Sequence, residues 1–279
     1  MNQKLYPERK TLNKPLIPKI LGILNVTPDS FSDGGRYIDV SEAVAAAAAM
    51  LAAGVDAIDV GGESTRPGGA EVSVSEEISR VVPVIRGIKK DHPDALISID
   101  TRKSAVAYAA LEAGASIVND VSMLTFDPAI TGVVREFNAT LVIGHIRGIP
   151  ETMDRFANYK DVVKEVGEEL LGAALKAELS GVSRDRIILD PGLGFAKNPE
   201  QNIEILRHLD YFNGLGYRLM IGHSRKRFLG AVCGIADPLK RDMATLACSC
   251  FLAGRCDWIR VHSAIEHAQA FKLLKELKG

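Results

Sequence analysis

The sequence has little cysteine and almost no net charge, and each shortage narrows the range of functions. Its 279 residues include 34 Lys and Arg and 35 Asp and Glu, a net charge of −1. No excess of either sign therefore favours nucleic acid or an anionic membrane surface as a partner. The cysteines lie in the last fifth of the chain and indicate a reduced protein: Cys233, Cys248, Cys250 and Cys256.

An apolar run typical of a signal peptide is also missing at the start of the sequence. Residues 1–19 are polar and basic, and Pro15 and Pro18 interrupt them. We therefore expect residues 1–18 to form an extension outside the core, and we expect a cytoplasmic protein without a membrane partner. A metal pair at Cys248-x-Cys250 is disfavoured, because side chains two positions apart on the predicted helix diverge.

The sequence does have eight short apolar runs that alternate with helical stretches from Lys19 onward. The predicted strands are 20–24, 57–60, 96–99, 116–118, 140–143, 186–189, 218–221 and 258–261. The predicted helices are 40–53, 75–90, 104–113, 128–137, 159–179, 199–209, 238–253 and 264–277. Eight such units over residues 19–279 predict an α/β protein, a single-domain (β/α)8 TIM barrel. A doubly wound sheet is the alternative, but no Gly-x-Gly-x-x-Gly follows the first strand.

The stretch RIILDPGLGF, residues 186–195, combines a buried strand with a carboxylate. Its β-branched run ends at Asp190, and the proline and glycines that follow predict a loop. An unpaired carboxylate at the end of a buried strand is costly, so Asp190 is expected to face a ligand cavity. A helix cap or a solvated loop residue is the alternative interpretation.

Polar residues also stand at the other predicted strand ends, which meet at one face of a barrel. The set is Asn25, Glu63, Asp100, Asn119, His145, Asp190, Lys226, Arg260 and His262. Asp100, Asn119, Asp190 and Lys226 suit a flat heterocycle with N–H donors and ring acceptors. Arg66, Arg260 and His262 suit an anion, and Asn25 offers an oxygen for Mg²⁺. The long loops 26–39 and 61–73 are predicted to be lids.

These residues lie in motifs that resemble the dihydropteroate synthase family. The matching stretches are GILNVTPDSFSDGG (22–35), DVGGESTRPGG (59–69), ISIDTRK (97–103), IVND (117–120), ILDPGLGFAK (188–197), SRKRFLG (224–230) and RVH (260–262). The resemblance implies condensation of 6-hydroxymethyl-7,8-dihydropterin diphosphate with p-aminobenzoate, giving 7,8-dihydropteroate and pyrophosphate. It also implies a dissociative mechanism, a Mg²⁺ cofactor and a homodimer formed through the final helices.

The resemblance assigns each site residue a role. The pterin would be held by Asp100, Asn119, Asp190 and Lys226. The diphosphate would be held by Asn25, Arg66, Arg260 and His262, with Asn25 on the metal. The p-aminobenzoate would be bordered by Thr65, Pro67, Phe195, Ser224 and Phe31, and the catalytic residues would be Asp100, Lys226 and Asp33.

Some positions depart from the family pattern, and two other functions stay open. The departures are Gly144-His145 for Met-His, Ser122-Met123-Leu124 for Ser-Gly-Gly, His223 for a small residue and Ser263 for Asp. The alternatives are a methyltransferase that uses methyltetrahydrofolate and a corrinoid protein, and a catalytically silent pterin-binding paralogue. The apolar residues of the last helices either form the dimer contact or face the barrel: Leu246, Phe251, Leu252, Phe271 and Leu274.

Overall fold

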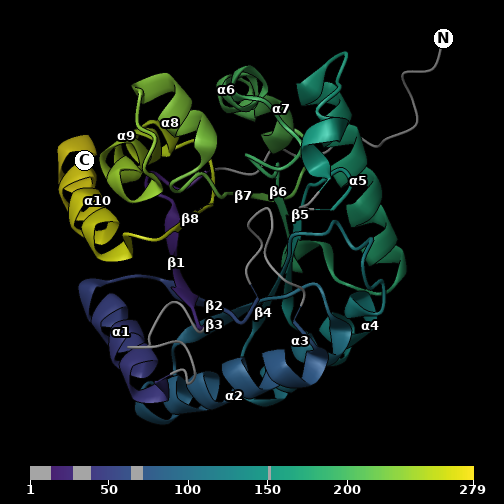
Figure 1. The fold of residues 1–279 in the computed structure, drawn as a ribbon, viewed down its shortest axis with the longest axis vertical. Helices are drawn as coiled ribbons and strands as arrows, with labels where there is room; N and C mark the ends of the chain where they lie inside the picture. The colour runs from purple at the N-terminus through teal and green to yellow at the C-terminus, as the bar shows by residue number, and fades with distance from the viewer. Residues whose placement is uncertain (1–13, 28–38, 64–71, 150–151) are drawn as a thin grey trace.

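Eight parallel strands close into a barrel in sequence order, and helices surround it (Figure 1). The computed structural model describes residues 14–27, 39–63, 72–149 and 152–279. The strands are β1 (Lys19–Asn25), β2 (Ala57–Gly61), β3 (Leu96–Asp100), β4 (Ile117–Asp120), β5 (Thr140–Gly144), β6 (Ile187–Asp190), β7 (Arg218–Ile221) and β8 (Trp258–Val261). The predicted (β/α)8 barrel is confirmed.

The helices follow the predicted order with differences in the last third of the chain. They are α1 (Val40–Ala53), α2 (Val74–Asp91), α3 (Ser104–Glu112), α4 (Ile130–Glu136), α5 (Val162–Leu179), α6 (Pro199–Arg207), α7 (Leu209–Asn213), α8 (Arg227–Cys233), α9 (Asp242–Leu252) and α10 (Ala264–Lys278). Short 3-10 segments are Met153–Phe156, Arg184–Arg186 and Pro238–Arg241. The predicted helix 199–209 ends early and α7 follows it, whereas α8 was not predicted.

Local signals explain where several helices begin and end. The Asp39 side chain accepts from the backbone N–H groups of Ser41 and Glu42, which would otherwise lack partners at the start of α1. Gly54 ends α1 with φ 97°, a conformation that glycine adopts without strain. Asn198 begins α6 with a reciprocal capping box to Gln201.

An apolar layer closes the inside of the barrel at the N-terminal side of the strands. It consists of Leu21, Ala57, Ile117, Val142, Ile188, Met220 and Trp258. A larger cluster packs between the strands and the outer helices, and it includes Leu252 and Phe271. These two residues therefore face the barrel, whereas Phe251 is 44% exposed. Among the described residues, no helix is long and apolar enough to cross a membrane.

Candidate active site

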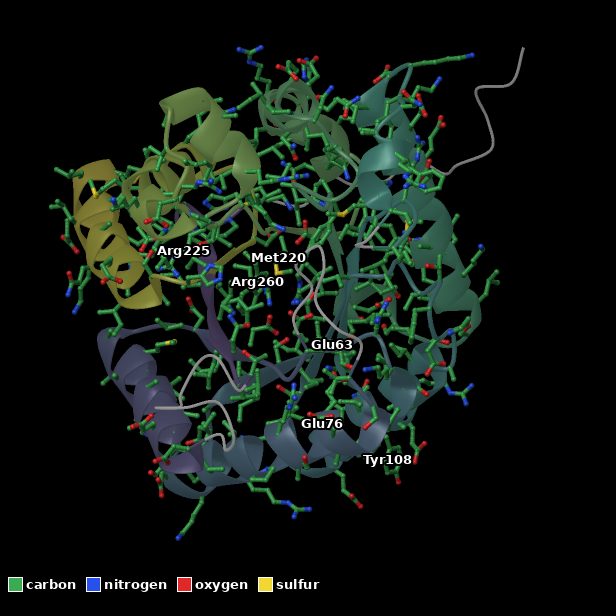
Figure 2. The ribbon with its side chains drawn as sticks, in the orientation of Figure 1. Glu63, Glu76, Tyr108, Met220, Arg225 and Arg260 are labelled. Carbon is green, nitrogen blue, oxygen red and sulfur yellow. The ribbon has the colours of Figure 1, made fainter. Side chains whose placement is uncertain are left out.

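A polar layer lies directly above the apolar layer on the inner face of the strands. Side chains on a strand alternate between two faces, so residues two apart share a face. Two positions beyond Ala57, Ile117, Ile188 and Trp258 stand Asp59, Asn119, Asp190 and Arg260. Because of this period, a ring of polar side chains follows the apolar ring on the same inner face, at the C-terminal end of the barrel. Figure 2 shows Arg260 and Met220 together inside the ring of strands.

Arg260 joins carboxylates from two other strands. Its Nε donates to Asp59 Oδ2 at 2.5 Å, and its Nη2 donates to Asp100 Oδ2 at 2.5 Å. Asn119 Nδ2 also donates to Asp59 Oδ2, at 3.2 Å. Asp59 is completely buried and belongs to the site, although it is not among the site residues predicted from the sequence. Its position in the apolar run AIDVG, two residues after Ala57, indicates that its side chain shares the inner face of the strand with Ala57.

The charges of this cluster are strongly perturbed. Burial raises the pKa of Asp100 to about 7, Arg260 opposes this rise, and Asp59 adds to it. Burial by itself would lower the pKa of Arg260, but Asp59 and Asp100 raise it. Asp59 Oδ1 and Asp100 Oδ1 are buried without a hydrogen-bond partner among the described residues. Such acceptors are costly unless a ligand donates to them.

Asp190 and Lys226 form the other side of the polar layer. Asp190 Oδ1 accepts from Gly192 N at 2.8 Å, and burial raises the pKa of this carboxyl against the opposing effects of Gly192 and Lys226. Burial and the neighbouring Arg260 lower the pKa of Lys226 to about 8, against the opposing effects of Asp190 and Asp100. Lys226 Nζ lies 3.9 Å from the centroid of the Phe195 ring, a cation–π distance. A carboxylate, an ammonium and an aromatic ring thus meet at one wall.

Three further predicted residues lie at the same end of the barrel. His262 Nδ1 lies 2.9 Å from Ser224 Oγ, which also accepts from His262 N at 3.1 Å. A Cβ placed on Gly61 would lie 3.7 Å from Asn25 Oδ1 and 3.8 Å from Asp100 Oδ2. The absence of a side chain at Gly61 therefore leaves room between these two oxygens.

The remaining predicted residues are placed differently or not described. Glu63 pairs with Arg102 at 3.1 Å and Lys103 at 2.7 Å, and His145 is completely buried. Neither joins the polar layer. Five predicted site residues lie outside the described part of the chain: Phe31, Asp33, Thr65, Arg66 and Pro67.

The described part of the chain contains no group of three or more His, Cys, Asp or Glu residues that could hold a metal ion. Asn25 can supply one oxygen. Mg²⁺ keeps several waters and often takes one or two protein oxygens together with phosphate oxygens. An Asn25 oxygen next to Gly61, which has no side chain, therefore fits a metal that arrives with a phosphorylated ligand.

The fold and the polar layer define a TIM-barrel protein with a ligand site at the C-terminal ends of its strands. The family model described as "Pterin binding enzyme" matches residues 21–262. A Synechocystis sp. protein called dihydropteroate synthase is 43% identical over 259 residues, covering 92% of this chain and 89% of that relative. The chain belongs to the dihydropteroate synthase family of pterin-binding enzymes.

Solved structures of this family share the whole fold. The Xanthomonas albilineans dihydropteroate synthase with 4-aminobenzoic acid has a TM-score of 0.87 at 36% identity, over 94% of both chains. The same organism's enzyme with 7,8-dihydropteroate has a TM-score of 0.84 at 34% identity, also over 94% of both chains. The similarity therefore extends well beyond the site motifs.

Proposed function

We propose that this protein is a dihydropteroate synthase. It condenses 6-hydroxymethyl-7,8-dihydropterin diphosphate with p-aminobenzoate and releases pyrophosphate. The observation that carries the proposal is the pair of buried carboxylates, Asp100 and Asp190, beside Lys226 at the end of a barrel that belongs to this family. The p-aminobenzoate and dihydropteroate complexes of the Xanthomonas albilineans enzyme support the choice of substrate and product.

The pterin is proposed to bind in the polar layer. Asp190 and Asp100 would accept its N–H groups, while Asn119 and Lys226 would donate to its ring nitrogen and carbonyl acceptors. The buried Asp100 Oδ1, which has no partner among the described residues, supports this assignment. A pterin N–H group would remove the cost of that unpaired acceptor.

The diphosphate is proposed to bind between Asn25, Arg260 and His262, together with Arg66, which lies outside the described residues. Asn25 would hold Mg²⁺, which when bound would neutralise charge on the leaving pyrophosphate. Arg260 would have to share its guanidinium between Asp59, Asp100 and the phosphate oxygens. Its five N–H donors permit that sharing.

The chemistry needs no protein nucleophile. The bond between the pterin methylene carbon and the diphosphate oxygen breaks, and its electron pair leaves with pyrophosphate. The amine nitrogen of p-aminobenzoate attacks the methylene cation and then releases a proton to solvent. The protein would contribute orientation and fixed charge, with the Asp100 and Asp190 carboxylates close to the cationic pterin. The predicted roles of the remaining residues are kept. We expect p-aminobenzoate to be bordered by Phe31, Thr65, Pro67, Phe195 and Ser224, and Asp33 to be catalytic.

We also propose a cytoplasmic homodimer formed through α9 and its neighbours. Several apolar side chains of this region are exposed: Val232 at 64%, Leu239 at 66%, Met243 at 76% and Phe251 at 44%. Burial of such side chains against a second copy would remove apolar surface from water. Sedimentation equilibrium should give twice the chain mass of 30.1 kDa, and a monomer at micromolar concentration would contradict the proposal.

Asp190→Asn tests the pterin assignment directly. The amide would place an N–H donor against the pterin's own donors, so affinity for the pterin diphosphate should fall by about 1–3 kcal/mol or more. Calorimetry measures the affinity, and thermal unfolding checks that the variant folds. A folded variant with wild-type affinity would show that Asp190 does not bind the pterin.

A further inference from the structure

Lys197 is a buried lysine behind the loop that follows Asp190. It is 4% exposed, and its Nζ donates to two carbonyl oxygens of that loop, Phe195 O at 2.9 Å and Gly192 O at 3.1 Å. The same Nζ lies 2.9 Å from His145 Nδ1. A single ammonium group thus contacts both ends of the turn between Gly192 and Phe195.

The loop backbone needs an external restraint. Gly192, Gly194 and Ala196 have φ values of 65°, 79° and 50°, and the left-handed conformation is unfavourable for the alanine. A Cβ on Gly192 would lie 1.9 Å from the His145 carbonyl oxygen, so the loop packs directly on the end of β5. Contacts from Lys197 hold this turn in place from its buried side.

The two loop residues that accept from Lys197, Gly192 and Phe195, each contact a residue of the proposed pterin site. Gly192 N donates to Asp190 Oδ1, and the Phe195 ring lies beside Lys226 Nζ. A shift of the loop would therefore move the hydrogen bond that orients Asp190 and the ring that lies against Lys226.

A chain of hydrogen bonds anchors Lys197 to helix α5. His145 Nε2 lies 3.0 Å from Glu169 Oε2, and Arg147 Nε lies 3.1 Å from Glu169 Oε1. Burial would raise the pKa of Glu169, but His145 and Arg147 lower it to about 2, so it is an acceptor. His145 must therefore carry its proton on Nε2, because burial and then Lys197 lower its pKa to about 4 and keep it neutral.

The tautomer of His145 in turn determines that Lys197 is the donor in the hydrogen bond between them. With the proton on Nε2, the Nδ1 lone pair accepts from Lys197 Nζ. Two carbonyls and one ring nitrogen require all three ammonium hydrogens. The geometry therefore favours the charged form, although burial lowers the pKa of Lys197 to about 7.

We propose that Lys197 is a positioning residue for the proposed reaction, fixed by His145 and Glu169, that sets the 191–196 loop so that Asp190 and Phe195 meet the substrates. The inference rests on the proposed function for its kinetic consequence. The restraint of the loop by Lys197 does not depend on the proposed function and can be measured without turnover.

The kinetic test compares Lys197→Met with Lys14→Met. Lys14 is part-buried, with a side chain that is 8% exposed and Nζ 2.5 Å from Asp257 Oδ2, but it lies at the opposite end of the barrel, where Asp257 precedes β8. Both variants should have lower melting temperatures. Only Lys197→Met should raise KM for both the pterin diphosphate and p-aminobenzoate, by about tenfold each. Equal KM values in the wild type and a folded Lys197→Met would overturn the proposal, as would the same rise in Lys14→Met.

Two measurements do not depend on turnover. Nitrogen-15 NMR of the wild type should show a neutral His145 protonated on Nε2, and a proton on Nδ1 would overturn the proposed role of Lys197 as donor. Amide hydrogen exchange of residues 192–196 should be faster in Lys197→Met and unchanged in Lys14→Met. Unchanged exchange in both variants would also overturn the proposal. A wild type that makes no product would instead contradict the proposed function and leave these two results valid.

Discussion

Asp100 and Lys226 show how far single residues depart from their behaviour in water. Burial raises the pKa of Asp100 to about 7 and lowers that of Lys226 to about 8. In both cases the buried environment disfavours the charged form, so the two values approach each other. The proposed pterin contacts use the charged forms of both residues.

Pterin affinity should therefore have a maximum between about pH 7 and 8. As the pH falls through the pKa of Asp100, this carboxylate takes up a proton and loses an acceptor. As the pH rises through the pKa of Lys226, the ammonium loses the proton that it would donate. Titration of a pterin that lacks the diphosphate, from pH 6 to 9, measures this. Asp100→Asn should remove most of the acidic limb and keep the alkaline limb, whereas a flat wild-type profile would contradict the assignment.

Arg260 should be important for stability as well as for the anion. Arg260→Met would leave Asp59 and Asp100 buried without their cationic partner, which typically costs about 3–5 kcal/mol. The loss should be larger at pH 9 than at pH 6, because protonation of Asp100 at low pH removes one of the two unpaired charges. Urea unfolding at both pH values measures the difference.

Arg184→Met is the control for that experiment. Arg184 pairs with Glu178, but its side chain is 45% exposed, so the loss should be under about 1 kcal/mol. A loss of that small size in Arg260→Met would mean that the carboxylates do not depend on Arg260. A stable Arg260→Met that still loses affinity for the diphosphate would assign Arg260 to the anion alone.

At the scale of elements, Lys103 joins three segments near the start of α3. Its Nζ donates to Glu63 Oε2 and Glu77 Oε2, each at 2.7 Å, and to Val72 O at 2.6 Å. Glu63 and Val72 lie on either side of residues 64–71, and Glu77 on α2 is completely buried. Lys103 thus fixes the described ends of the β2–α2 connection and neutralises a buried carboxylate.

Lys103→Met should lower the free energy of unfolding by about 3–5 kcal/mol, because the buried Glu77 carboxylate would lose its ammonium partner. Lys90→Met on the exposed face of α2 is the control and should change stability by less than about 0.5 kcal/mol. Thermal and urea unfolding measure both variants. Similar stabilities would show that Glu77 is satisfied without Lys103.

Most elements could be predicted from the sequence because each strand is a short apolar run with a loop signal at its end. The fourth strand was predicted as 116–118 but spans Ile117–Asp120, because Asn119 and Asp120 look like loop residues yet pair with β5. Helix α8 was missed because it has seven residues, and its packing through Phe228 and Leu229 is a tertiary effect.

The site could be predicted where residues belong to a strand end or a motif, and not where distant segments meet. Asp190 and Lys226 stand in recognisable motifs, and the structure places both in the polar layer. Lys197 contacts His145, 52 residues away, and Lys103 contacts Glu77, 26 residues away. No local pattern indicates such pairs, because they depend on how the loops pack on the barrel. Asp59 differs from these residues, because the alternation of side chains along its strand is a local pattern that places it on the inner face.

In the whole molecule, the residues that stabilise the fold and the residues that form the site occupy different layers along the barrel axis. The apolar layer, which includes Leu21 and Trp258, fills the barrel at the N-terminal side of the strands. The polar layer places charged side chains at the C-terminal ends of the strands. The buried groups of that polar layer are expensive to maintain, with Asp59 Oδ1 and Asp100 Oδ1 lacking partners in the described residues. A ligand that satisfies them accounts for their presence better than folding does.

The measurement that tests this account most directly is turnover by the purified protein. With the pterin diphosphate, p-aminobenzoate and Mg²⁺, the wild type should release one pyrophosphate for each dihydropteroate formed. Asp190→Asn should reduce this rate by about tenfold or more. A folded wild type that forms no dihydropteroate would contradict the proposed function, and methyl transfer from methyltetrahydrofolate to a corrinoid protein would then identify the other enzyme class.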